Sequence, residues 1–175
     1  MVLIGLFGCT WQTEPEPYRE KLSTDIVADL LIDEYEVRFD DLSDRCKEHL
    51  HTVVYVGRGE RIYPDRSFAL GIQSLDAFGE HWYDGVSYIW LEKSLTATSY
   101  NTFLVHKLIH ALLACKSDPK GIGIADGDGD HNEPDMWCTT GHGCRWDGRD
   151  NADSLEYAVA EMVRYWHESP TEFGK

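Results

Sequence analysis

The chain has 175 residues, a length typical of one domain. A hydrophobic fraction of 42%, with 12% aromatic residues, supports a packed core and excludes a disordered composition. The formal net charge of −15 argues against nucleic acids and anionic membrane surfaces as partners, because binding polyanions requires clustered cations.

The first residues form a short apolar run that ends at Cys9, and a polar segment with prolines follows up to Pro17. The run is far shorter than the roughly 20 apolar residues of a membrane-spanning helix, so we expect no transmembrane segment. It resembles the end of a bacterial lipoprotein signal, with Leu6-Phe7-Gly8-Cys9 as the lipobox and Cys9 as the acylated residue. This implies that residues 1–17 are a signal remnant and tether of an exported, extracellular or cell-envelope protein with a lipid anchor. The alternative is a buried first strand.

Four further cysteines remain, an even number that suits an exported protein with disulfides. They are Cys46, Cys115, Cys138 and Cys144. Four cysteines allow three pairings, and the sequence does not choose among them, although Cys138 and Cys144 are close enough to close a small loop. The alternative for that loop is a second metal site with Cys138, His142 and Cys144.

Helical spacing of apolar residues predicts a first helix over Lys21–Ile32, with candidate capping residues at 23–25. The alternation in Tyr35–Phe39 predicts a short strand. A second helix is expected to begin at 40–43 and to run through Leu50 toward Val54.

Residues 57–85 are hard to assign, although Arg61–Tyr63 and Phe68–Ile72 are candidate strands. Val86–Leu91 is the strongest strand signal in the chain, because it is β-branched and aromatic and follows an Asp-Gly turn pair. A helix over Thr102–Cys115 follows, apolar nearly all round and therefore expected in the core.

The segment Lys116–Arg149 is rich in Gly and Asp, which predicts a functional loop rather than a spacer. An amphipathic helix over Ser154–Trp166 closes the chain. Helices and strands together predict an α+β fold, and because no linker or repeat is visible, residues 18–175 are expected to form a single domain.

Two histidines, His106 and His110, are four residues apart in the predicted core helix. That spacing places both side chains on one helix face, one turn apart, where both can reach one Zn²⁺. The alternative is a pair of ordinary core histidines, since this spacing also occurs by chance.

The segment Val86–Trp137 resembles the zincin metallopeptidases, which place an active-site helix with the motif H-E-x-x-H after an edge-type strand; this chain reads H-K-x-x-H. The resemblance implies a zincin-like domain, with a small mixed sheet packed on the active-site helix and on the C-terminal helix. It also implies peptide-bond hydrolysis by a zinc-bound water, with a peptide or protein as substrate or ligand.

Such a site needs a third protein ligand, and His131 is the preferred candidate. Met136 follows it by five residues, which is similar to the ligand and Met-turn of the metzincin branch, although the usual metzincin position is held here by Lys116. The competing ligands are Glu156 and Glu161, as in the gluzincin branch. Three loop acids could instead form a Ca²⁺ site, and they are Asp126, Asp128 and Asp130.

Lys107 occupies the position of the glutamate that acts as general base in these enzymes. A lysine ammonium cannot accept that proton, so we expect a metallopeptidase-like protein with impaired or no hydrolysis. The alternative is a non-catalytic extracellular binding module that keeps a structural Zn or Ca site.

Overall fold

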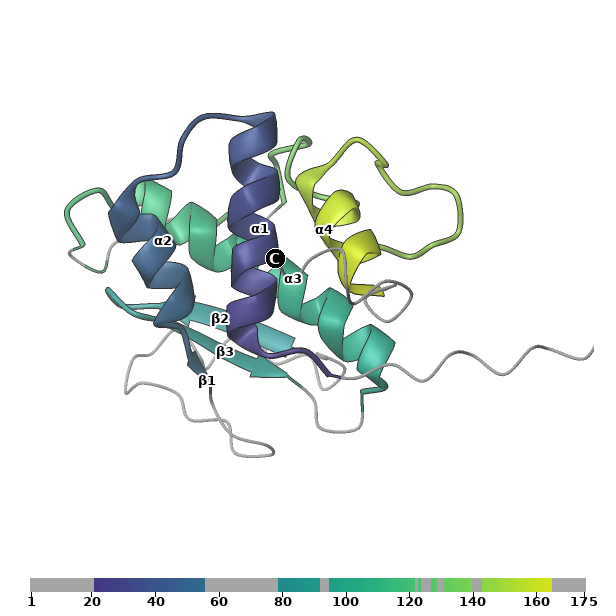
Figure 1. Cartoon of the computed structure of the whole chain (residues 1–175), viewed down its shortest axis with the longest axis horizontal. Coiled ribbons are helices and arrows are strands. Elements are labelled where there is room, and N and C mark those ends of the chain that lie inside the picture. Colours follow the sequence, from purple (N-terminus) through teal and green to yellow (C-terminus); the bar gives the residue numbers. More distant parts are fainter. Residues whose placement is uncertain are drawn as a thin grey trace, which may run out of the picture.

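The structure is a computed structural model that describes residues 21–55, 79–91, 95–121, 123, 127–128, 131–139 and 143–164 (Figure 1). Several predicted features lie outside the described residues, namely the segment 1–17 with Cys9, the candidate strands Arg61–Tyr63 and Phe68–Ile72, and Asp126, Asp130 and His142. The described part combines helices with strands, as the α+β prediction requires.

The strands form a mixed sheet in the order β1-β3-β2, built from β1 (Val54–Tyr55), β2 (Gly79–Tyr83) and β3 (Ser87–Leu91). The central strand, β3, is parallel to β1 and antiparallel to β2. The strand predicted at Val86–Leu91 is confirmed, but within the described sheet it is the central strand and not an edge strand. β2, at the edge, lies in the stretch that the sequence left unassigned.

Helix α1 (Thr24–Arg38) begins three residues later than the predicted Lys21 and ends six residues beyond Ile32. Ser23, one of the expected capping residues, caps it by accepting a hydrogen bond from the Ile26 amide. The strand predicted at Tyr35–Phe39 is wrong, since α1 continues to Arg38. Tyr35 and Phe39 are four residues apart and their rings are in contact, with centroids 5.0 Å apart, whereas Val37 between them is 81% exposed. The apparent alternation of apolar residues thus comes from two aromatic residues four positions apart on one face of the helix and from one valine that faces solvent.

Helix α2 (Asp44–His51) is capped by Ser43, as expected, but it ends before Val54. Val54 and Tyr55 instead pair with β3 to form β1. A disulfide between Cys46 and Cys115 joins α2 to helix α3 (Ala97–Ser117), with the Cα atoms 5.7 Å apart.

Helix α3 lies in the core, passing behind α1 in Figure 1, and contacts both the sheet and the other helices. It begins five residues earlier than predicted because the Thr96 side chain caps it by accepting from the Ser99 amide. At its other end, the Arg45 guanidinium donates to the carbonyls of Cys115 and Asp118, which satisfies terminal acceptors of the helix.

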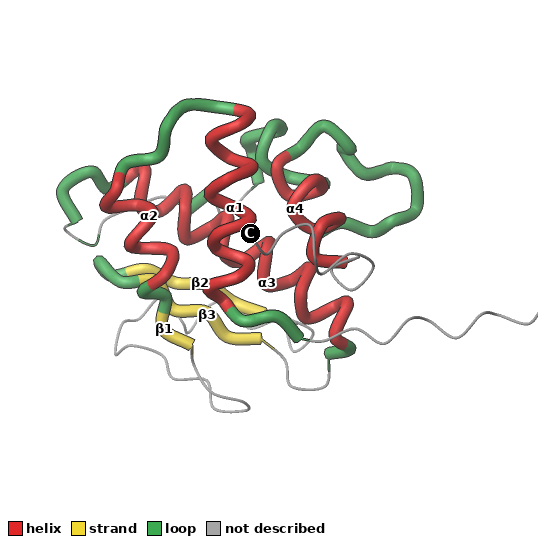
Figure 2. The backbone as a smooth tube through the Cα atoms, viewed as in Figure 1, coloured by secondary structure: helices red, strands yellow, loops and turns green. Residues whose placement is uncertain are grey.

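Helix α4 (Leu155–Arg164) follows a long loop segment, drawn in green in Figure 2. Its main neighbours are α3 and α1, whereas the sequence prediction had the sheet packing on this helix. Helix α3 contacts the sheet as well as α4, and it brings His106 to 2.7 Å from Glu156 of α4.

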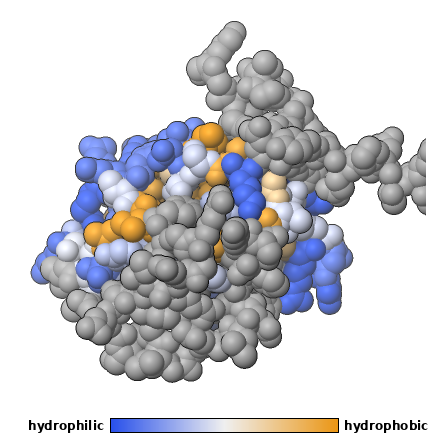
Figure 3. Space-filling view, turned by 90° about the horizontal axis from the view of Figure 1, so that it is seen from below, coloured by the Kyte–Doolittle hydropathy of each residue, from blue (hydrophilic) through white to orange (hydrophobic). Residues whose placement is uncertain are grey.

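The described surface carries few large apolar side chains, and Val54 and Val86 are the two at the sheet. The view from below shows apolar and hydrophilic groups side by side on this surface (Figure 3). Among the described helices, none is both long and apolar enough to cross a membrane.

Candidate metal centre

Helix α3 presents His106 and His110 one turn apart, as the sequence predicts, and both side chains are buried. Their Nε2 atoms are 3.3 Å apart. His131, from the loop that precedes α4, brings its Nε2 to 3.2 Å from that of His106. Together they form a buried group of three imidazoles that could hold a metal ion.

The other ring nitrogen of each α3 histidine has its own partner. His110 donates its Nδ1 hydrogen to the Gly127 carbonyl at 2.7 Å, which leaves a lone pair on Nε2. His106 Nδ1 lies 2.7 Å from a carboxylate oxygen of Glu156, so with Glu156 ionised the His106 proton also sits on Nδ1. Partners of this kind fix the ring orientation and tautomer of metal-binding histidines.

The distances from His106 Nε2 to the other two Nε2 atoms fit a tetrahedral zinc ion. Zn–N bonds of about 2.05 Å at a tetrahedral angle place two nitrogens about 3.3 Å apart. The observed separations are 3.3 Å and 3.2 Å. Two lone pairs facing each other at that distance repel unless a cation lies between them, so the donor set suits a metal with an affinity for imidazole.

Asp128 holds the loop that carries His131. Its carboxylate accepts hydrogen bonds from the amides of Asn132 and Glu133 and from the Trp137 indole, at 2.9, 3.0 and 2.6 Å. Burial opposes the ionised carboxylate, but these donors outweigh it and lower the pKa of Asp128. Both Asp128 and His131 have left-handed backbone conformations, with φ of 52° and 54°. Such a conformation is costly for a histidine, so the Asp128 contacts hold His131 in place.

Trp137 is a site residue that sequence reasoning missed. Its ring packs against His106, His110 and His131, at centroid distances of 5.0, 4.6 and 4.5 Å. Met136, the residue at the position expected for a metzincin Met-turn, is buried in the core next to it. The sequence offered no signal for Trp137 except its closeness to His131.

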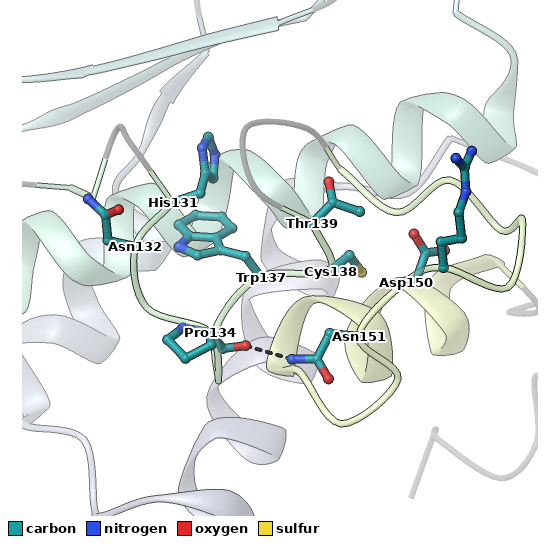
Figure 4. Close-up of a pocket in the computed structure, with 9 residues that line it drawn as sticks. His131, Asn132, Pro134, Trp137, Cys138, Thr139, Asp150 and Asn151 are labelled. Carbon is teal, nitrogen blue, oxygen red and sulfur yellow. Dashed lines mark hydrogen bonds between the residues drawn. The ribbon is translucent and has the colours of Figure 1, made fainter.

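A cavity of about 410 Å³ adjoins the centre through His131 and Trp137. Figure 4 shows Trp137 between His131 and the Cys138–Thr139 segment, with Pro134 and Asn151 joined by a hydrogen bond below it. The walls of this cavity combine an aromatic face and a proline with amide and hydroxyl groups and with the charged Arg149 and Asp150. Such a mixture of apolar and polar groups is typical of ligand pockets.

Lys107 is half-buried in α3, between the two histidines. Burial, and then the Lys107 ammonium, hold the pKa of His110 well below its usual value. His81 of β2 stacks on His110 with ring centroids 6.0 Å apart, and burial, His110 and Lys107 also lower its pKa. Neutral imidazole is the form that binds metals.

The two candidate glutamates of α4 lie in different surroundings. Glu156 is 1% exposed and bridges His106 Nδ1 and the Cys138 amide, so in this structure its carboxylate lies behind a histidine and not among the three Nε2 atoms. Burial raises the pKa of Glu156 to about 8, against the opposing effects of the Cys138 amide, His131 and Lys107. A metal on His106 would favour the ionised form. Glu161 is exposed on α4 and lies outside the described metal-binding groups.

Lys116 and Asp128 are both engaged in contacts that do not involve the three imidazoles. Lys116, at the usual metzincin ligand position, donates to the Tyr35 hydroxyl and lies over its ring. Asp128 is committed to three N–H donors, and a Ca²⁺ ion would compete with them. The calcium site stays a prediction, because Asp126 and Asp130 lie outside the described residues.

A disulfide joins Cys138 and Cys144 across the small loop that the spacing suggested, with Cα atoms 5.1 Å apart. The bonded pair accounts for both cysteines that a second metal site would have used. The loop covers Glu156: Cys138 donates its amide to the carboxylate at 2.8 Å, and a Cβ at Gly143 would lie 3.3 Å from the other oxygen. Both ends of the disulfide loop thus lie against the partner of His106.

Comparisons with protein-family models, with curated proteins and with solved structures find no match to this chain. Its function is therefore inferred from the geometry and chemistry of the three histidines.

Proposed function

We propose that the chain is a zinc-binding domain of the zincin metallopeptidase type, exported from the cell and impaired in peptide hydrolysis by Lys107. The convergence of three buried imidazoles, with two of their Nε2 separations at zinc-like spacing, supports this proposal most strongly. Two disulfides are compatible with an extracellular location. A lipid anchor on Cys9 is a further part of the proposal.

The residues divide into ligands and supports. His106, His110 and His131 would hold the metal, and Glu156 and the Gly127 carbonyl would orient the two α3 rings. Zinc supplies Lewis acidity and a water of lowered pKa when it is bound at such a site. The cavity beside His131 would receive part of a peptide ligand.

The chain's own residues account for the expected loss of activity. The position after His106 supplies the general base in H-E-x-x-H enzymes, and general acid–base catalysis contributes about 10²–10⁴-fold to a rate. Lys107 as an ammonium has no lone pair with which to accept a proton. Glu156 cannot replace it, because both of its oxygens are occupied on the far side of His106.

Lys107→Glu tests the proposal. With equal zinc content, the variant is expected to cleave an unfolded protein substrate at a rate at least about 10²-fold above the parent chain. Lys107→Gln is the control, since it removes the charge without supplying a base, and no gain is expected. A Lys107→Glu variant that binds a full equivalent of zinc but gains no activity would favour a non-catalytic binding module with a structural metal.

A further inference from the structure

The disulfide between Cys138 and Cys144 brings together three metal donors outside the three-histidine centre. The two Sγ atoms and a carboxylate oxygen of Glu156 all lie within 4.8 Å of one another. Cys138 and Glu156 are buried, and Cys144 is half-buried. Thiolates and carboxylates are both zinc ligands, so this group has the composition of a metal site in which the two sulfurs are bonded to each other.

The Glu156 carboxylate is held against both ends of this loop. One oxygen accepts from the Cys138 amide at 2.8 Å, and a Cβ at Gly143 would lie 3.3 Å from the other oxygen. The lack of a side chain at Gly143 therefore leaves room for the carboxylate beside Cys144. Each carboxylate oxygen has two lone pairs, so Glu156 can bind a metal here while it still accepts from its present donors.

The disulfide between Cys46 and Cys115 offers a contrast within the same chain. Among the residues that the structure describes, neither of these cysteines belongs to a group of three metal donors. The Arg45 guanidinium lies 3.7 Å from Cys46 Sγ, and a cation there opposes the binding of a metal ion. Both cysteines are buried, whereas Cys144 is half-buried, so a reductant reaches the bond to Cys144 more readily.

We propose that the Cys138–Cys144 disulfide is the closed form of a second metal site, which a dithiol reductant opens and which Zn²⁺ then occupies through both sulfurs and Glu156. The reductant transfers two electrons and two protons to the two sulfurs, which breaks the bond between them, and is itself oxidised to a disulfide. Zinc then releases both thiol protons to solvent, because the thiolate is the form that binds metals. A tetrahedral zinc ion holds two sulfurs about 3.8 Å apart, and Cα atoms 5.1 Å apart permit this separation.

This inference goes beyond the proposed metallopeptidase-like centre and does not depend on it, since the two sites share no metal ligand. It adds a metal uptake that thiols control. Glu156 would serve both sites, as a ligand of the second metal and as the partner of His106.

Zinc stoichiometry before and after reduction tests the second site. The parent chain and His131→Ala, which is expected to empty the first centre, are treated briefly with a dithiol, desalted without oxygen and exposed to zinc. Elemental mass spectrometry then gives the zinc content. We expect reduction to add about one zinc per chain in both proteins, because one tetrahedral ion fits the two sulfurs and one carboxylate.

Two controls assign the added zinc to this loop. A variant with Cys138→Ser and Cys144→Ser should gain no zinc on reduction, while the Cys46–Cys115 link stays intact. Alkylation of the free thiols after brief reduction should abolish the gain without any substitution. Mass spectrometry of the peptides then shows which cysteines carry the alkyl group, and we expect Cys138 and Cys144.

The outcomes separate this site from the three-histidine centre. A chain whose Cys138 and Cys144 are free thiols but which gains no zinc overturns the second site. A bond that the dithiol does not open in the folded chain, or a gain that persists in the double serine variant, overturns it as well. An oxidised parent chain that binds no zinc, but gains one equivalent on reduction, contradicts the three-histidine centre and supports the second site.

Discussion

Glu156 is the side chain whose role depends most on its exact surroundings. It is buried, it accepts from the Cys138 amide, and it contacts His106 Nδ1 at 2.7 Å. As a carboxylate it would increase the basicity of the imidazole and fix its Nδ1-protonated tautomer, and such outer partners of metal ligands commonly contribute about 10–100-fold to metal affinity. The sequence could identify Glu156 only as a candidate ligand. A residue that binds the metal and a residue that hydrogen-bonds a metal ligand differ in their distance to the metal, which the sequence does not give.

Glu156→Gln should therefore lower zinc affinity by about 10–100-fold. The amide keeps the shape of the side chain but loses the negative charge that orients and polarises His106. Competition with a chromophoric chelator measures the change. Glu161→Gln is the matched control on the exposed part of the same helix, and its affinity should equal that of the parent chain. Equal losses in both variants, or none in Glu156→Gln, would contradict the assigned role.

Asp128→Ala should weaken zinc binding by releasing His131, because the Asp128 carboxylate holds the loop on either side of that histidine. Three N–H donors would lose a charged acceptor, and hydrogen bonds to charged groups contribute about 1.5–3 kcal/mol each. Zinc affinity and the melting temperature of the zinc-loaded chain should both fall. Asp135→Ala, an exposed acid in the same loop, is the comparison, and an equal effect there would count against a specific hold on His131.

Among the secondary-structure elements, α3 connects the sheet, α2 and α4, and it carries two of the three imidazoles. The sequence predicted this helix and its core position well, because helical periodicity and burial leave a clear signal in apolar residues. It failed at Tyr35–Phe39, where the exposed Val37 imitated strand alternation. It also failed to place β2, whose pairing with β3 is a long-range property that local sequence does not encode.

The two disulfides should have separable effects. The chain-entropy model gives about 4 kcal/mol for the Cys46–Cys115 link, which spans 69 positions, and about 2 kcal/mol for Cys138–Cys144, which spans 6. Paired serine variants of the first link should lower the free energy of unfolding of the metal-free chain more. Variants of the second should lower zinc affinity more, because Cys138 and Gly143 at the ends of that loop lie against Glu156. Denaturant unfolding and zinc titration of both variants measure the two effects, and the reverse order in either would contradict this division.

The three imidazoles come from two segments, α3 and the loop before α4, which the tertiary fold brings together. A metal that binds the folded state and not the unfolded state stabilises the fold by about 2.7 kcal/mol at a concentration about 100 times its dissociation constant. His106 and His110 were predictable as a pair from helical spacing alone. His131 was predictable only through the resemblance to metallopeptidases, and Trp137 and Asp128 were not predictable as supports, since their roles arise from loop geometry.

Zinc stoichiometry is the decisive measurement for this centre. The purified chain is stripped with a chelator, exposed to zinc and desalted, and its zinc content is then measured by elemental mass spectrometry. Single alanine variants at His106, His110 and His131 are treated in the same way, and a variant at the exposed His51 is the control. We predict one zinc per chain in the parent and in His51→Ala, and well below one in each of the other three. A His131→Ala chain that retains a full equivalent of zinc, or a parent chain that binds none, would contradict the three-histidine centre.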